Sequence, residues 1–252
     1  MRILLTNDDG IHAPGIRAMH AALIKAGHVV HVVAPITEQS AVGHALTMSL
    51  PLRVKEIREN GFVGLGVSGT PVDSVKLGLT ALVEDKPELI VSGINSGANV
   101  GVDILYSGTV SAATEGALMG FPALAVYVDE FNPVDLAEQA DWCAALIVRI
   151  PWHRVPEKCV LNLNFPKGPF REAKGLRLCP HTKVPYNDWY EKRTDPRGRT
   201  YYWLNGVIPP GKVSPGRDRS LLSDGHITLT PLRFDFTDRE TLSVLESVLG
   251  RP

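Results

Sequence analysis

Residues 2–10 read RILLTNDDG. The apolar run Ile3-Leu4-Leu5 predicts a short buried strand, and the polar run Asn7-Asp8-Asp9-Gly10 follows it directly. Ligands of mostly parallel sheets gather at the carboxyl ends of the strands, where two adjacent carboxylates need a positive partner. A hard divalent cation is the natural partner because Mg²⁺, Mn²⁺ and Ca²⁺ prefer oxygen ligands. The same four residues are also typical of a turn or of the start of a helix. Other parts of the chain are therefore needed to distinguish a metal site from a turn.

Strand and helix patterns alternate along the first two thirds of the chain. We expect strands at residues 2–6, 29–34, 89–91, 123–128 and 159–163, and helices at 14–26, 71–83, 109–119 and 136–150. Alternation at this length predicts right-handed βαβ units and a parallel sheet covered on both faces. The fold class is therefore α/β, a three-layer Rossmann-like sandwich with a mostly parallel sheet.

Two segments break the alternation. Within residues 46–67, we expect a hairpin excursion with short strands at 47–50 and 52–55. Residues 180–215, rich in Tyr, Trp, Pro, Gly and Arg, predict a projecting hairpin or arm with its strongest strand signal at 201–204. Such an arm packs on another subunit or serves as an internal flap over the active site. A strand at about 225–232 and a helix at 238–249 complete one domain spanning residues 1–252.

Composition limits the function classes. The chain has 252 residues, is 44% hydrophobic, and carries 26 Lys and Arg against 27 Asp and Glu, for a net charge of −1. Without a basic surplus, we expect a small ligand and no nucleic-acid polymer. No apolar stretch predicts a membrane span, and the start does not resemble a signal peptide. The three cysteines lack C-x-x-C spacing, which fits a reducing cytoplasm.

Three loops fall where the alternation places the carboxyl ends of the strands, the edge where Asp8 and Asp9 lie, and the third of them opens a helix. They span residues 37–41, 92–99 and 106–110. Ser40 and Asn95 would add two neutral oxygens to the two carboxylates, a set that suits an octahedral Mg²⁺-type ion. The run Ser107-Gly108-Thr109 would present free N–H groups and hydroxyls at a helix N-terminus, which is a ready anion site. A metal beside an anion site indicates phosphate chemistry.

Other patterns favour other functions less strongly. The G-x-G-x-x-G run at residues 64–69 lies outside the first βα turn that a dinucleotide fingerprint requires. The opening strand and the run Gly27-His28-Val29-Val30 resemble the start of sugar-nucleotide glycosyltransferases, which remain the rival enzyme class. A non-catalytic nucleotide sensor is the non-enzymatic alternative. His12 and His44 could approach the site, although a surface or supporting role is the simpler interpretation.

Several runs match a known family in order along nearly the whole chain. They are residues 6–11, 13–15, 33–40, 69–73, 91–99, 106–110, 201–203 and 225–232. On these runs the chain resembles the SurE (survival protein E) family of metal-dependent nucleotidases. The chain departs from that family's pattern at Ile36 and Ser74, where many members have Asp and Cys. Neither position is a metal ligand in the family pattern.

The resemblance implies a phosphomonoesterase acting on nucleoside 5′- and 3′-monophosphates, with one divalent cation, Mg²⁺ or Mn²⁺, per subunit. By similarity, the metal ligands are Asp8, Asp9, Ser40 and Asn95. The phosphate side comprises Asn99, Ser107, Gly108 and Thr109. We expect Asp8, Asp9 and Ser107 to carry catalysis, with Asp9 the best candidate to accept a proton from water. The resemblance also implies a homodimer or homotetramer that exchanges C-terminal elements, in agreement with the predicted arm.

Overall fold

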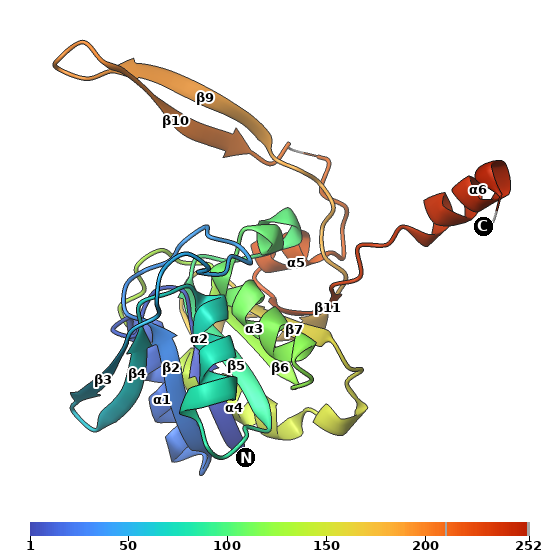
Figure 1. Cartoon of the computed structure of the whole chain (residues 1–252). Coiled ribbons are helices and arrows are strands. Elements are labelled where there is room, and N and C mark those ends of the chain that lie inside the picture. The colour runs from blue at the N-terminus through green and yellow to red at the C-terminus, as the bar shows by residue number, and fades with distance from the viewer. Residues whose placement is uncertain (210, 251–252) are drawn as a thin grey trace.

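Within residues 1–209 and 211–250, which the computed structural model describes, a nine-stranded sheet has the order β3-β4-β2-β1-β5-β6-β7-β11-β8 (Figure 1). The strands of this sheet are β1 Arg2–Thr6, β2 Val29–Pro35, β3 Val54–Glu59, β4 Phe62–Val67, β5 Leu89–Ser96, β6 Ala123–Val128, β7 Cys159–Phe165, β8 Leu176–Leu178 and β11 Ile227–Arg233. Strands β4, β2, β1, β5, β6 and β7 run parallel. β3 and β11 pair antiparallel with their neighbours β4 and β7.

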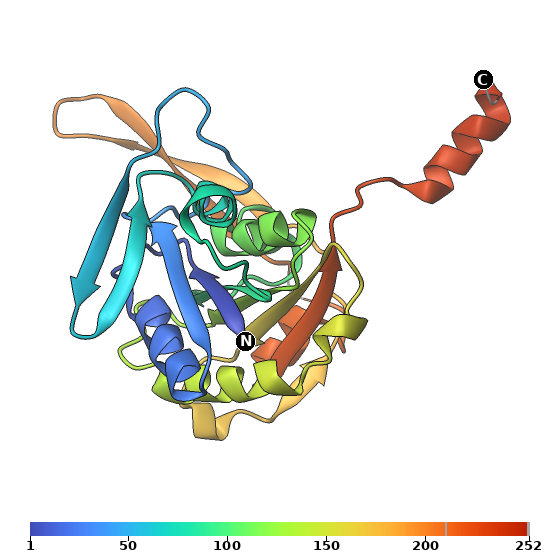
Figure 2. The same cartoon turned by 60° about the horizontal axis from the view of Figure 1, so that its bottom comes forward.

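Helices cover both faces of this sheet. The helices packed on the sheet are α1 Pro14–Lys25, α2 Pro71–Leu77, α3 Gly108–Leu118, α4 Ala137–Arg149 and α5 Asp218–Ser223, whereas α6 Arg239–Leu249 lies apart from it. Ile3 and Leu5 of β1 belong to the core under α1 and α4, whereas Leu4 belongs to the core under α2 and α3. Figure 2 shows the sheet between these two helix pairs. The predicted three-layer α/β class is confirmed.

Most predicted elements of the core have the expected type, with different ends. The helix expected at 71–83 stops being α-helical at Leu77 and continues as a π-helical turn, Gly78–Leu82. The strand expected at 89–91 continues to Ser96, with a register shift against β6 between Ser92 and Asn95. The loop expected at 92–99 therefore starts later, and Asn95 lies within the strand.

The segment between β2 and α2 contains the expected hairpin, but its strands are formed by other residues than predicted. The expected strands at 47–50 and 52–55 are wrong, because the hairpin is formed by β3 and β4. Its turn is Asn60-Gly61, with φ of 49° and 81°. Both residues have the positive φ that a two-residue hairpin turn of this twist requires, and Asn-Gly is the preferred pair for it.

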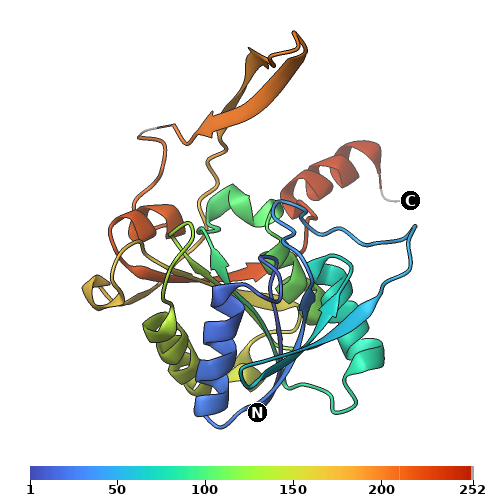
Figure 3. The same cartoon turned by 90° about the vertical axis from the view of Figure 1, so that its left-hand side faces the viewer.

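Two C-terminal segments extend away from the sheet and its helices. Strands β9 Asn187–Thr194 and β10 Thr200–Val207 form a separate antiparallel hairpin, and α6 projects at another side (Figures 1 and 3). The hairpin exposes large side chains, including Trp203 at 57%. The predicted arm at 180–215 includes Pro210, which lies outside the described residues, as do Arg251 and Pro252 of the predicted domain. Among the described residues, no helix combines the length and apolar character needed to cross a bilayer.

Candidate metal and phosphate site

The carboxyl ends of three adjacent parallel strands bring the predicted oxygen ligands to one edge. β1 lies between β2 and β5 in the sheet. Asp8 and Asp9 follow β1, Ser40 lies in the loop after β2, and Asn95 lies near the end of β5. A hollow of about 260 Å³ is lined by Asp8, Ser40 and Asn95 together. The fold thus gathers residues that are far apart in sequence around one space.

Asp8 is held by the first turn of α3. The Thr109 N–H donates to Asp8 Oδ2 at 3.0 Å, and the Thr109 hydroxyl donates to Asp8 Oδ1 at 2.5 Å. The side chain is only 5% exposed. The pKa of Asp8 is raised to about 6, chiefly by burial and also by the neighbouring charge of Asp9, while the hydrogen bonds from Thr109 lower it. A raised pKa is expected for a buried carboxylate, such as Asp8, that has no positively charged partner.

Asp9 faces the other side of the same edge. Its Oδ2 accepts a hydrogen bond from the Ser96 N–H at 2.9 Å. Burial raises the pKa of Asp9, the Ser96 hydrogen bond lowers it, and the charge of Glu38 raises it. Glu38 also accepts a 2.5 Å hydrogen bond from the Ser40 hydroxyl. This third carboxylate, which was not among the predicted site residues, adds negative charge to the site.

The donor chemistry fits a hard cation. None of the ion pairs among the described residues involves Asp8 or Asp9. The Asn95 amide donates to the carbonyls of Ser96 and Gly97, which leaves its oxygen free of any hydrogen bond from the described part of the chain. That part contains no group of three His, Cys, Asp or Glu side chains placed for a metal. The site instead offers two carboxylates with neutral oxygens, which suits Mg²⁺ or Mn²⁺ better than Zn²⁺.

The start of α3 differs from its predicted role in one respect. The N–H groups and hydroxyls at this helix end were expected to be free to bind an anion, but the N–H and the hydroxyl of Thr109 both donate to Asp8. The Ser107 hydroxyl caps the helix by accepting from the Val110 N–H at 3.1 Å, and lies 3.0 Å from the Tyr127 hydroxyl. Gly108 packs so closely on Asp8 that an added Cβ would lie 2.8 Å from Asp8 Oδ2. The helix end thus holds a carboxylate of the site directly.

Asn99 lines the same hollow and is clamped by β7. Its N–H donates to Asn164 Oδ1 at 2.9 Å, and its carbonyl accepts from Asn162 Nδ2 at 2.9 Å. Both partners are 1% exposed. Neither residue was predicted to belong to the site, although two Asn residues at alternate positions of a buried strand are a usable signal, since buried polar groups need partners.

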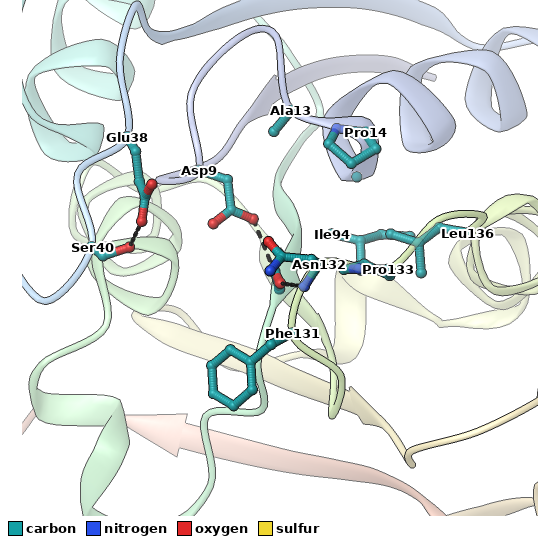
Figure 4. A pocket seen from close by; sticks show the side chains of 12 residues that line it. Asp9, Ala13, Pro14, Glu38, Ser40, Ile94, Phe131, Asn132, Pro133 and Leu136 are labelled. Atoms are coloured by element: carbon teal, nitrogen blue, oxygen red, sulfur yellow. Dashed lines mark hydrogen bonds between the residues drawn. The ribbon is translucent and has the colours of Figure 1, made fainter.

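A second hollow of about 360 Å³ adjoins the first. It is lined by Asp9, Glu38 and Ser40 on one side, and by Phe131 and Asn132 of the loop after β6 on the other (Figure 4). Ser40, Ser96 and Phe131 line both hollows. Asp8 lines only the first hollow and Asp9 only the second, and of the two hollows only the first reaches Ser107, the N-cap residue of α3.

The root of the hairpin also reaches the first hollow. Tyr186, directly before β9, lines it together with Asp103. Arg219 of α5 donates to Asp103 Oδ2 at 2.6 Å, and its guanidinium lies 5.5 Å from the Tyr186 ring centroid. His12 and His44, by contrast, lie beside Glu59 and Glu115 and line neither hollow.

Comparisons with known proteins give one consistent result. Residues 3–188 match the family model described as Survival protein SurE. A protein named 5′-nucleotidase SurE from Maridesulfovibrio salexigens is 64% identical over 250 residues, which cover 99% of this chain and 100% of that protein. Another protein of that name, from Gloeobacter violaceus, is 45% identical over 97% of this chain and 94% of its own length. The crystal structure of a SurE protein from Aquifex aeolicus superimposes with a TM-score of 0.84 at 35% identity, covering 99% of this chain and 100% of that one.

Proposed function

The chain belongs to the SurE family, and from this premise we propose that it is a divalent-metal-dependent nucleotidase that hydrolyses nucleoside 5′-monophosphates to nucleoside and inorganic phosphate. Nucleoside 3′-monophosphates are the second substrate class of the proposal. One observation carries it: Asp8, Ser40, Asn95, Asn99 and Ser107 line a single hollow at the carboxyl edge of the sheet. Oxygen ligands for a cation and polar side chains for a phosphate, Asn99 and the N-cap residue Ser107, then meet in one space.

Each residue has a part in the proposed reaction. Asp8 and Asp9 hold the cation, and the oxygens of Ser40 and Asn95 complete the protein's share of its ligands. The bound Mg²⁺ or Mn²⁺ supplies charge that polarises a phosphoryl oxygen and lowers the pKa of water.

The remaining residues serve the phosphate. Asp9, which lines the second hollow, accepts the proton of the attacking water. Ser107, the Gly108 N–H and Asn99 face the phosphoryl oxygens. Thr109 contributes to this end of the site by fixing Asp8. Catalysis by positioning and charge stabilisation is typical of phosphoryl transfer.

A phosphate-release assay tests the proposal. With AMP or GMP as substrate, we expect inorganic phosphate to appear with Mn²⁺ or Mg²⁺ and to stop when a chelator is added. A sugar-nucleotide glycosyltransferase, the rival that the first strand suggests, would release no phosphate from a nucleoside monophosphate. A nucleotide sensor would bind AMP with Mn²⁺ without turnover. Either of those results would refute the nucleotidase.

We further propose that the chain forms a homodimer or homotetramer through its C-terminal projections. The β9–β10 hairpin exposes Tyr202 at 59%, Trp203 at 57% and Leu204 at 60%. On α6, Leu242, Leu245 and Leu249 follow helical spacing and are also exposed. Large apolar side chains exposed on two projecting segments favour an association surface.

Shortening the hairpin tests the assembly. We expect that deleting residues 190–204 and joining Trp189 to Asn205, which face each other across the hairpin, through an Asn-Gly turn lowers the mass measured by light scattering. The deletion retains Tyr186 at the hollow. Lys192→Ser, a change of an exposed polar residue on the same hairpin, serves as the control and should leave the mass unchanged. An unaltered mass after the deletion would remove the hairpin from the assembly surface.

The cytoplasm is the compartment that we propose for this activity. Cys143, Cys159 and Cys179 are all buried and free of disulfides. Free thiols are the usual state of cysteines in a reducing compartment.

A further inference from the structure

One aromatic ring stands at the junction of the two hollows of the site. Phe131 lines both of them and is 84% exposed, although it belongs to the loop that follows the central strand β6. Figure 4 shows its ring beside the space that Asp9 and Ser40 face. Ligand pockets are commonly lined by aromatic side chains beside a few polar groups, so this ring is a candidate ligand contact.

We propose that the Phe131 ring is the face on which the base of the nucleotide stacks. This inference rests on the proposed function, because it takes the phosphate end of the ligand to lie by Asp8 and Ser107. The two hollows, of about 260 and 360 Å³, share Ser40, Ser96 and Phe131 in their walls, so a ligand larger than phosphate that starts in one would reach the other past these residues. Phe131 lies where such a ligand would cross.

The Phe131 loop is tied to the site by hydrogen bonds. The Asn132 N–H donates to the Ser96 hydroxyl at 2.9 Å, and that hydroxyl donates to the Glu130 carbonyl at 3.1 Å. The Ser96 N–H in turn donates to Asp9. Residues on both sides of Phe131 are therefore bonded to the residue that orients Asp9. The backbone that carries the ring is held at a set position relative to the carboxylates, so little ordering of the loop is needed when a base stacks on Phe131.

Glycine at position 97 makes room for the ring. An added Cβ there would lie 3.1 Å from Phe131 Cε1, closer than nearly all real Cβ contacts. The Gly97 N–H also donates to the Glu130 carbonyl at 3.0 Å. One edge of the ring thus rests on Gly97 while most of its surface stays open. An open aromatic face suits a purine or pyrimidine because every base has a π-face.

The aromatic residues of the hairpin do not have this placement. Trp189, Tyr190 and Trp203 are exposed but line neither hollow. Tyr106, 62% exposed, lines only the first hollow. Among the described aromatic residues, Phe131 alone borders both spaces and so can contact a base whose phosphate lies beside Asp8.

Substrates with and without a base separate stacking from other effects. For Phe131→Ala, we expect the KM for AMP to rise about ten-fold, equivalent to about 1.4 kcal/mol, with kcat little changed. The kcat/KM for ribose 5-phosphate, which has no base, should stay within about two-fold because no stacking is lost. Phe131→Trp should keep the wild-type KM for AMP. Val134→Ala, at a 99% exposed position of the same loop, is the control and should change neither substrate's kinetics.

Binding of adenosine provides a readout that needs no turnover. By titration calorimetry, adenosine should bind the Phe131→Ala variant about ten-fold more weakly than the wild type. Equal adenosine affinities would overturn the stacking proposal, and so would equal losses of kcat/KM for AMP and ribose 5-phosphate. A wild type that binds adenosine through Phe131 but releases no phosphate from AMP would instead overturn the proposed function alone.

Discussion

Asp8→Asn lowers metal-dependent phosphate release from AMP roughly a thousand-fold in our account, corresponding to about 4 kcal/mol of transition-state stabilisation. The reason is charge: the variant keeps the shape of the side chain and an oxygen for Thr109, but removes one of the two carboxylates that hold the cation. Steady-state kinetics with saturating Mn²⁺ measures the effect. Asp85→Asn, at an exposed position away from both hollows, serves as the control and should retain full activity.

The stability of the metal-free variant distinguishes a lost ligand from a damaged fold. Asp8 is buried, and its raised pKa shows that its charge is unfavourable without a partner. We therefore expect the free energy of unfolding of the metal-free protein to change by less than about 1 kcal/mol, since the lost hydrogen bond to Thr109 offsets the removal of the charge. Mn²⁺ should raise the Tm of the wild type but not of the variant. Near-normal turnover by Asp8→Asn would refute the ligand assignment.

Gly15→Ala should destabilise the fold by about 3 kcal/mol. An added Cβ at Gly15 would lie 1.8 Å from the Ile94 carbonyl oxygen, which is backbone and cannot rotate away. Helix α1 would have to move off β5 at the residue before Asn95. The midpoint of urea unfolding measures the loss, and phosphate release should fall with it because the site is displaced.

A second glycine supplies a matched control. Gly78 is also buried, with helical φ and ψ of −54° and −51°. A Cβ there would meet Leu4 and Val33 side chains no closer than 3.4 Å, which is ordinary contact. Gly78→Ala should therefore leave stability unchanged or raise it by up to about 1 kcal/mol. Equal urea midpoints for Gly15→Ala and the wild type would contradict the close approach of α1 to β5.

The core of the fold was predictable from local pattern. Strand β6 spans Ala123–Val128 as expected, because a short all-apolar run bounded by turn residues is typical of a buried strand. The β3–β4 hairpin was misplaced, although Asn60-Gly61 is a strong turn signal between two strand-like runs. The extension of β5 through Gly93 could not be read locally, since turn-prone residues there pair with β6 in the sheet.

The candidate site was predictable only in outline. Parallel neighbours β2, β1 and β5 place their carboxyl ends together, so the meeting of Asp8, Ser40 and Asn95 follows from topology. The hydrogen bonds from Thr109 to Asp8 join residues 101 apart in sequence, and no local pattern encodes them. Because of these two hydrogen bonds, the N-terminus of α3 binds the Asp8 carboxylate.

The sequence pattern also did not indicate Phe131 as a residue of the site. A single aromatic residue in a loop is common, and its significance depends on the hydrogen bonds that fix Glu130 and Asn132 to Ser96. These bonds cross between the ends of β5 and β6. Tertiary contacts of this kind, which no short motif encodes, position the loop residues that contact a substrate.

Crystals soaked in Mn²⁺ test the central claim most directly. Anomalous difference density at the manganese edge should show one peak per subunit, within coordination distance of the carboxylates of Asp8 and Asp9 and of the oxygens of Ser40 and Asn95. A map without a peak there, or with manganese bound only elsewhere on the chain, would contradict the account.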